Sequence, residues 1–221
     1  MRKKLNLLAA LFALFVFSSA ANAQIVIDEF DVGNDLEVFG VGMDMDQTVD
    51  SSILGGTRDE SLTVVQPAVG IAVLGTFGFD GDFSIVQGSS DQIQGSLTYS
   101  LAGEDLTDGG SLDAFFLDIT SSDGITISDV LQISVGDSNG VNAIQSVTLP
   151  AVAQPVLVGF SSFGALDFTS VDSLALEFDF ANAPGGDFSI GSFQAVAIPE
   201  PGSLCLLSMT SLVLLRRRRS I

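Results

Sequence analysis

Carboxylates recur at short intervals in one stretch of this sequence. Asp44, Asp46 and Asp50 lie within seven residues, with a glutamine and a threonine between them. Side-chain oxygens at this spacing are the donors that a hard cation such as Ca²⁺ prefers. The stretch is not an EF-hand loop, because Val49 and Gly55 stand where that loop has its glycine and its distal glutamate. The pattern makes calcium a candidate ligand but not a required cofactor.

A second pair of carboxylates, Asp80 and Asp82, flanks a glycine and is a weaker candidate for calcium. Further side-chain oxygens gather at Asp105 and Asp108, and in the turn that ends at Asp123. Aspartate and glycine are also the ordinary residues of surface turns. Solvated turns are therefore the simpler interpretation of all these clusters.

The charges of the chain are unevenly distributed. It holds eight lysines and arginines against 27 acids, for a net charge of −19, and seven of the bases lie in the first four and last six residues. The long stretch between them has one base, Arg58. Because so acidic a surface repels polyanions, binding to nucleic acid is excluded.

Arg58 has two interpretations. It could clamp an anionic ligand, or it could pair with Asp59, Glu60 or a carboxylate across a sheet. Since the surrounding acids would oppose an anion, we expect the structural ion pair.

Residue types that commonly carry catalysis are scarce. The chain has no histidine or tryptophan, one tyrosine, Tyr99, and one cysteine, Cys205. This excludes His-dependent triads, His-ligated metal sites and indole platforms for sugars, and it leaves the central stretch without a disulfide. We therefore expect a protein that is not an enzyme. A carboxylate-dependent glycosidase or lyase stays open as an alternative, because its two acids need to be close in space and not in sequence.

The first 23 residues have the pattern of a secretory signal peptide. A basic start is followed by an apolar run from Leu5 to Phe17 and by small residues at Ala21 and Ala23. This order predicts recognition by the export machinery and cleavage before Gln24.

The other end of the chain has a three-part pattern. Pro199, Glu200 and Pro201 precede an apolar run of about twelve residues, which would span about 18 Å as a helix against a bilayer core of about 30 Å. The run is followed by four bases, which would hold the end of the chain on the cytoplasmic side: Arg216, Arg217, Arg218 and Arg219. A segment this short suits a temporary membrane stop better than a permanent anchor.

This tail resembles the PEP-CTERM sorting signal of Gram-negative bacteria, from about Ile198 onward. The resemblance implies processing by an exosortase, a membrane-embedded cysteine transpeptidase-like enzyme, after a transient stay in the inner membrane. It implies a final location at the cell surface or in the extracellular matrix, with exopolysaccharide as a candidate partner. The tail departs from a purely apolar run at Cys205 and at three polar residues, and it lacks the Leu-Pro-x-Thr-Gly motif of sortase substrates.

Between the two ends, apolar and polar residues alternate with period two, which is typical of half-buried strands. We expect one acidic domain over residues 24–195, with the sorting tail over 196–221. The expected strands are 25–30, 36–41, 61–66, 70–76, 83–87, 93–99, 112–119, 125–128, 131–135, 143–149, 155–160, 174–180 and a last strand after Phe188. Their polar faces carry Gln94, Ser96 and Thr98, then Gln132 and Ser134, then Ala175, Glu177 and Asp179.

These strands predict an all-β fold, a two-sheet antiparallel sandwich of jelly-roll type. A signal helix would precede it and a hydrophobic helix would follow it. A right-handed β-solenoid is the second choice, disfavoured because no regular repeat is present. The first and last strands also loosely resemble those of jelly-roll carbohydrate-binding-like domains, a resemblance that identifies no binding residue.

Three local features refine this prediction. Asn139-Gly140 lies between alternating segments and predicts a tight hairpin. The pentapeptide Gly-Asp-Phe-Ser-Ile occurs at 81–85 and at 186–190, and in a chain rich in these residues we attribute the match to chance or to common strand-entry chemistry, not to duplication. After the second copy the apolar positions change parity, which predicts a β-bulge at Gly191-Ser192.

The sequence thus indicates an exported, non-catalytic surface or matrix protein with a removable sorting tail. A calcium-assisted carbohydrate-binding module is the alternative from the binding class, and phenylalanines exposed on one sheet would favour it.

Overall fold

The computed structural model describes residues 23–39, 41–66, 74–79, 81–87, 92–122, 130–180 and 186–198. The predicted signal peptide, the Pro199 to Arg219 tail, Asp80, Asp123 and the strand expected at 125–128 lie outside these ranges. Across the described ranges, no helix is long and apolar enough to cross a bilayer.

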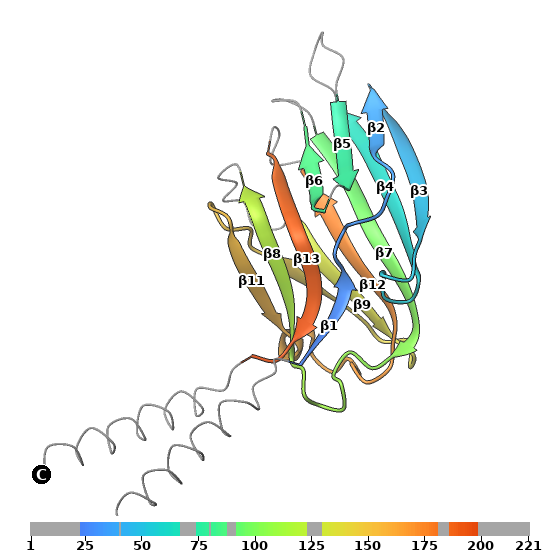
Figure 1. Ribbon diagram of the computed structural model, residues 1–221, viewed down its shortest axis with the longest axis vertical. Coiled ribbons are helices and arrows are strands. Elements are labelled where there is room, and N and C mark those ends of the chain that lie inside the picture. Colours follow the sequence, from blue (N-terminus) through green and yellow to red (C-terminus); the bar gives the residue numbers. More distant parts are fainter. Residues whose placement is uncertain are drawn as a thin grey trace, which may run out of the picture.

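Two antiparallel sheets face each other and form the body (Figure 1). Sheet A has the order β11-β8-β13-β6-β5-β2, with β1 added beside β13; sheet B has the order β10-β9-β12-β7-β4-β3. The strands of sheet A are β1 (Gln24–Asp28), β2 (Leu36–Phe39), β5 (Leu74–Phe79), β6 (Phe83–Val86), β8 (Ala114–Ser122), β11 (Gln154–Gly159) and β13 (Phe188–Val196). Those of sheet B are β3 (Gly42–Val49), β4 (Thr57–Gln66), β7 (Gln92–Glu104), β9 (Leu131–Asp137), β10 (Asn142–Val147) and β12 (Val171–Asp179). A short 3-10 helix, Phe160–Phe163, follows β11.

The predicted two-sheet antiparallel sandwich is confirmed in the described part of the chain. Each described strand pairing is antiparallel, which is incompatible with the parallel coils of a β-solenoid. Strand β3 was not predicted, and β4 begins at Thr57, four residues before the expected start.

Alternation along the strands places apolar side chains between the sheets. On β9, Leu131, Ile133 and Val135 are buried, while the residues between them face outward. Phe115 is the centre of an aromatic cluster, with ring centroids 4.9 Å from Phe160 and 5.3 Å from Phe193. Burial of these large side chains is the main favourable term in a domain without disulfides.

The two copies of the repeated pentapeptide pair with each other. β6 and β13 are antiparallel neighbours, with Ser84 opposite Ser189 and Phe83 opposite Ile190. The two copies therefore lie side by side in one antiparallel ladder of sheet A.

The predicted bulge is also present, because the register between β13 and β8 shifts on either side of Ile190 and omits Gly191. A Cβ on Gly191 would lie 2.8 Å from Cγ2 of Thr120, so glycine is the residue that fits there.

The predicted hairpin joins β9 to β10. Gly140 has a φ of 79°, and its N–H donates to the carbonyl of Asp137 at 3.0 Å. The side chain of Asp137 accepts the backbone N–H groups of Asn139 and Val141 at 2.9 Å, and that of Asp167 at 3.0 Å. One carboxylate thus joins the hairpin to a loop thirty residues further along the chain.

Asp137→Asn should make the free energy of unfolding less dependent on pH in the acidic range. The hydrogen bonds from Asp167 and Val141 hold the pKa of Asp137 below its ordinary value of 3.8. The contribution of the ionised Asp137 to the stability of the fold is therefore complete above pH 3.8, the pKa in the unfolded chain, and is lost as the pH falls through the lower pKa of the folded state. Urea unfolding from about pH 7 to about pH 2 should show Asp137→Asn below wild type near neutrality, with the difference closing in acid. Asp172→Asn, at an exposed position, is the control, and a difference that stays constant with pH would contradict this role.

Candidate functional site

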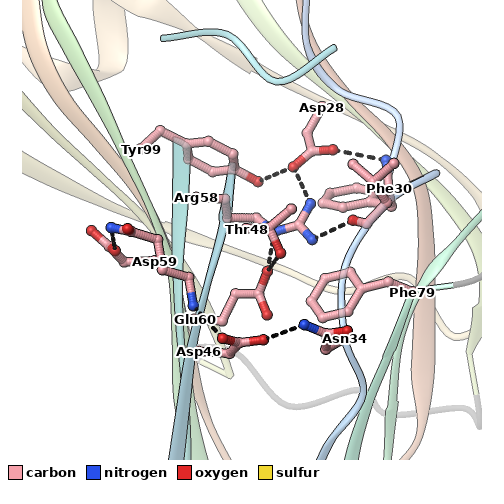
Figure 2. Close-up of polar contacts among 12 residues, drawn as sticks. Asp28, Phe30, Asn34, Asp46, Thr48, Arg58, Asp59, Glu60, Phe79 and Tyr99 are labelled. Atoms are coloured by element: carbon pink, nitrogen blue, oxygen red, sulfur yellow. Dashed lines mark hydrogen bonds and ion pairs between the residues drawn. The ribbon is translucent and has the colours of Figure 1, made fainter. Parts of the chain in front are cut away.

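The single base of the described chain is fully buried. Arg58 on β4 has no exposed surface and points between the sheets, where three groups accept its hydrogens (Figure 2). Its Nη1 donates to Asp28 Oδ2 at 2.5 Å, its Nε to Glu60 Oε1 at 2.9 Å and its Nη2 to the carbonyl of Val32 at 2.7 Å. The guanidinium carbon also lies 4.0 Å from the ring centroid of Phe79. The expected structural ion pair is confirmed, with Glu60 and a cross-sheet carboxylate as partners.

The carboxylate of Asp28 holds several elements together. It accepts the hydroxyl of Tyr99 at 3.0 Å, and its other oxygen accepts the N–H of Phe30 at 2.8 Å. Asp28 ends β1 of sheet A, whereas Arg58 and Tyr99 belong to sheet B. Burial, followed by the nearby charge of Asp28, raises the pKa of Tyr99 well above its ordinary value, so the phenol stays a neutral donor. Asp59, the other predicted partner of Arg58, faces outward and accepts from Gln47.

Glu60 is the least satisfied member of this network. Burial raises its pKa above the ordinary 4.5, although hydrogen bonds from Thr48 and Arg58 act in the opposite direction. Its Oε2 is buried and has no hydrogen-bond partner among the described residues. The ion pair with Arg58 therefore compensates a real desolvation cost.

The predicted calcium candidates are placed apart from one another. Asp44 and Asp46 lie on β3, where they accept hydrogens from the Glu37 backbone and from the Asn34 side chain. Asp50 bonds to Ser52 just after that strand, and Asp82 accepts the hydroxyl of Thr120. No three acidic, histidine or cysteine side chains of the described ranges come together as a metal site.

The outer face of sheet B carries the candidate site. An open groove of about 410 Å³ runs over its strands. Its lining is mostly short hydroxyl, amide and carboxylate side chains: Ser61, Thr63, Gln94, Ser96, Thr98, Gln132, Ala175, Glu177 and Asp179, with Gly95 and Phe178. We call this the polar groove.

Strand register aligns these side chains in rows across the sheet. Two rows pass over all six strands. One is Met45, Ser61, Ser96, Glu177, Gln132 and Ser146, and the other is Gln47, Asp59, Thr98, Ala175, Ser134 and Ile144. A shorter row on the other side of the first is Met43, Thr63, Gln94 and Asp179. With strands about 4.8 Å apart, each six-strand row spans about 24 Å. The polar faces of β7, β9 and β12 were predicted, but their assembly into one groove was not.

Two acids, Glu177 and Asp179, line the groove and project from the same face of β12. Most of the other side chains that line it are hydroxyls and amides.

No phenylalanine faces outward on the described strands of sheet B, where Phe178 points into the core. The exposed aromatic residues that would favour a stacking type of carbohydrate module are therefore not found on this sheet.

No family model and no curated protein sequence matches the chain. Solved structures resemble it at low identity. A family 11 carbohydrate-binding module from Clostridium thermocellum, in complex with a β-1,3-1,4-mixed-linked tetrasaccharide, is 20% identical with a TM-score of 0.43, over 82% of this chain and 99% of that one. A family 30 module of a cellulosomal cellulase from the same organism is 13% identical with a TM-score of 0.40, over 80% and 99%. An exo-β-agarase is 11% identical with a TM-score of 0.43, over 80% and 26%.

Arg58→Met should strongly destabilise the protein, because it leaves Glu60 and Asp28 buried without their cation. Loss of one partner of a buried ion pair costs about 3–5 kcal/mol, which urea unfolding near pH 7 would measure. The raised pKa of Glu60 sets the sign of the pH dependence. A protonated Glu60 avoids the desolvation cost of a buried charge. Its contribution to the stability of the fold is therefore complete below 4.5, the pKa of glutamate in the unfolded chain, and is lost as the pH rises through the higher pKa of the folded state. Arg58 acts to lower the pKa of Glu60, so its removal should raise that pKa further and keep Glu60 protonated to a higher pH. The deficit of Arg58→Met relative to wild type should therefore be smaller near pH 5 than near pH 7.

Adding Asp28→Asn and Glu60→Gln to Arg58→Met is the control. Neutralising both acids should restore part of the lost stability. Unchanged unfolding of the single variant would show that the ion pair is not structural.

Proposed function

We propose that this protein is an exported, non-catalytic component of the cell surface or extracellular matrix that binds a polysaccharide along the polar groove. The observation that carries the proposal is the groove itself, with its aligned hydroxyl, amide and carboxylate side chains on the outer face of one sheet. Sugar hydroxyls are both donors and acceptors, and serine, threonine and glutamine offer both functions in return.

The dimensions favour a polymer over a single sugar. The groove is open and lies over four strands, about 14 Å across, and the rows of side chains that line it continue onto β3 and β10 for about 24 Å, a length that accommodates several linked rings. A small-molecule site would instead enclose most of its ligand in a concave apolar pocket. An open polar track suits a chain that continues beyond the protein at both ends.

The charge of this face restricts the class of polysaccharide that it can bind. Asp59, Glu177 and Asp179 project on this face, while Arg58, the one base of the described ranges, is buried on the opposite side of the sheet. A polysaccharide rich in uronate or sulfate would be repelled. Neutral and amino polysaccharides are therefore the expected ligands, and calcium would matter only if it bridged these acids to an anionic chain.

The sorting tail supplies the location in this proposal. Gln24, the expected new N-terminus, pairs with Val196 across β1 and β13. The N–H of Ile198 donates to Asp113 at 2.7 Å, so the folded body holds the chain up to the residue before Pro199. Both expected processing points thus lie next to each other at one end of the sandwich. This geometry supports cleavage of both ends of the chain at one membrane surface.

Replacing Gln94 and Gln132 together with alanine should weaken polysaccharide binding. Each lost side-chain hydrogen bond costs about 1 kcal/mol, or about fivefold in affinity, so the pair should lose at least about tenfold. Affinity electrophoresis of the full-length protein against neutral, amino and acidic polysaccharides, with and without calcium, would measure this. Gln194→Ala, on the outer face of sheet A, is the matched control. Equal binding by the double variant and by wild type would remove the groove as the binding site.

Deleting the exosortase of the native host should leave the tail on the protein. We expect mass spectrometry of the surface form to show a C-terminus near Pro199-Glu200-Pro201 in wild type and an intact Arg216 to Arg219 segment in the deletion strain. Conversion of Pro199 and Pro201 to alanine should give the same uncut product in the wild-type strain. A surface form that retains the four arginines in wild type would refute the sorting proposal.

A further inference from the structure

One edge of sheet B exposes apolar side chains next to the polar groove. Met43 and Met45 on β3 are 63% and 67% exposed. Met43 lies opposite Thr63 and Met45 opposite Ser61, and both of these β4 partners line the groove. Val65, 46% exposed, projects from the same face of β4. We call Met43, Met45 and Val65 the apolar shelf.

The shelf is costly unless it is covered by a ligand. An edge strand with exposed apolar residues invites pairing with another chain, and proteins usually place charges there. On β3 the charges point the other way, since Asp46 accepts from the side chain of Asn34 and Asp44 from the backbone N–H of Glu37 on β2. Methionine is flexible and polarizable and adapts to irregular surfaces. The outward face of β3 therefore has the properties of a contact surface.

We propose that Met43 and Met45 receive the apolar C–H face of a sugar ring while Ser61 and Thr63 bind the hydroxyls at its edge. This inference rests on the proposed function of the groove. A sugar ring has an apolar face and polar edges, and the chain presents a matching border between shelf and groove at the Met43–Thr63 and Met45–Ser61 pairs of the β3–β4 ladder. The methionines would then do what exposed aromatic residues do elsewhere, on a sheet face without them.

A second copy of the chain is the competing occupant of the shelf. The net charge of −19 opposes association of two copies, and Asp59 lies on the same face opposite Gln47. A neutral ring carries no such repulsion, so the polysaccharide is the favoured occupant.

The proposal has a chemical consequence. Methionine at an exposed site reacts with hydrogen peroxide: the O–O bond breaks, one oxygen bonds to the thioether sulfur, and water leaves. The product is a polar sulfoxide, which would no longer suit the apolar face of a ring. Residues 24–195 contain no other methionine and no cysteine, histidine or tryptophan, and their one tyrosine, Tyr99, is buried. Within residues 24–195, peroxide should therefore oxidise Met43 and Met45 selectively.

Two double variants of the full-length protein test the proposal. Met43→Gln with Met45→Gln removes the apolar surface, while Met43→Leu with Met45→Leu keeps it but cannot be oxidised. Binding to mixed-linked β-1,3-1,4-glucan and to the exopolysaccharide of the native host is measured before and after peroxide treatment. We expect the Gln pair to bind about tenfold more weakly, peroxide to weaken wild type to a similar degree, and the Leu pair to bind normally and resist peroxide. The Leu pair also separates the shelf from Met1, Met209 and Cys205.

Leu157→Gln, a 49% exposed residue on β11, is the control for adding a surface amide. Normal binding by the Gln pair, or equal peroxide sensitivity of wild type and the Leu pair, would overturn the proposal. The proposal would also be overturned if sedimentation showed a wild-type dimer that the Gln pair converts to a monomer while polysaccharide binding stays unchanged. If Gln94→Ala with Gln132→Ala abolishes binding and the Gln pair does not, the proposed function of the groove is supported and the proposal for the shelf is refuted. If wild type binds neither polysaccharide, both proposals are refuted.

Discussion

The buried guanidinium of Arg58 is the interaction on which the arrangement of both sheets depends. It joins β4 to the end of β1 through Asp28, and Tyr99 on β7 bonds to the same carboxylate. A buried charge of this kind tolerates little displacement, because each lost contact exposes a desolvation cost. Since side chains alternate along a strand, fixing Arg58 and Glu60 inward also fixes Asp59, Ser61 and Thr63 outward. The polar groove is thus positioned by a network on the opposite face of its own strands.

Burial of that base also determines the electrostatic character of the exterior. With Arg58 enclosed, the described surface presents carboxylates without a compensating cation. The resulting negative field opposes the approach of a second copy of the protein and of any anionic polymer. This repulsion protects an edge strand whose outward residues would otherwise promote association. The burial of Arg58 therefore contributes both to the ion-pair network and to the negative charge of the surface.

Much of the sandwich could be predicted from the period-two pattern, including the Asn139-Gly140 hairpin and the bulge at Gly191. Strand β3 could not, because its apolar residues face solvent and its acids face inward, the reverse of the usual pattern. Its aspartates suggested a cation loop instead. The groove was predictable only in parts: the polar faces of β7, β9 and β12 were evident, but placing β12 between β9 and β7 requires pairings between segments far apart in the sequence. Such pairings depend on tertiary packing, which local alternation does not encode.

A surface of hydroxyls and amides has a characteristic weakness as a binding site. Each hydrogen bond to a sugar replaces one to water, so its net contribution is only about 0.5–1.5 kcal/mol. Affinity must then come from many aligned contacts, from apolar area, or from several protein copies on one polymer. In the proposed site the rows across the sheet would provide the first, and Met43 and Met45, at the β3 end of two of these rows, would provide the second. Deposition of many copies in a matrix, as the sorting tail would bring about, supplies the third. Weak single sites then suffice, since a polymer that crosses several proteins is held by their combined contacts.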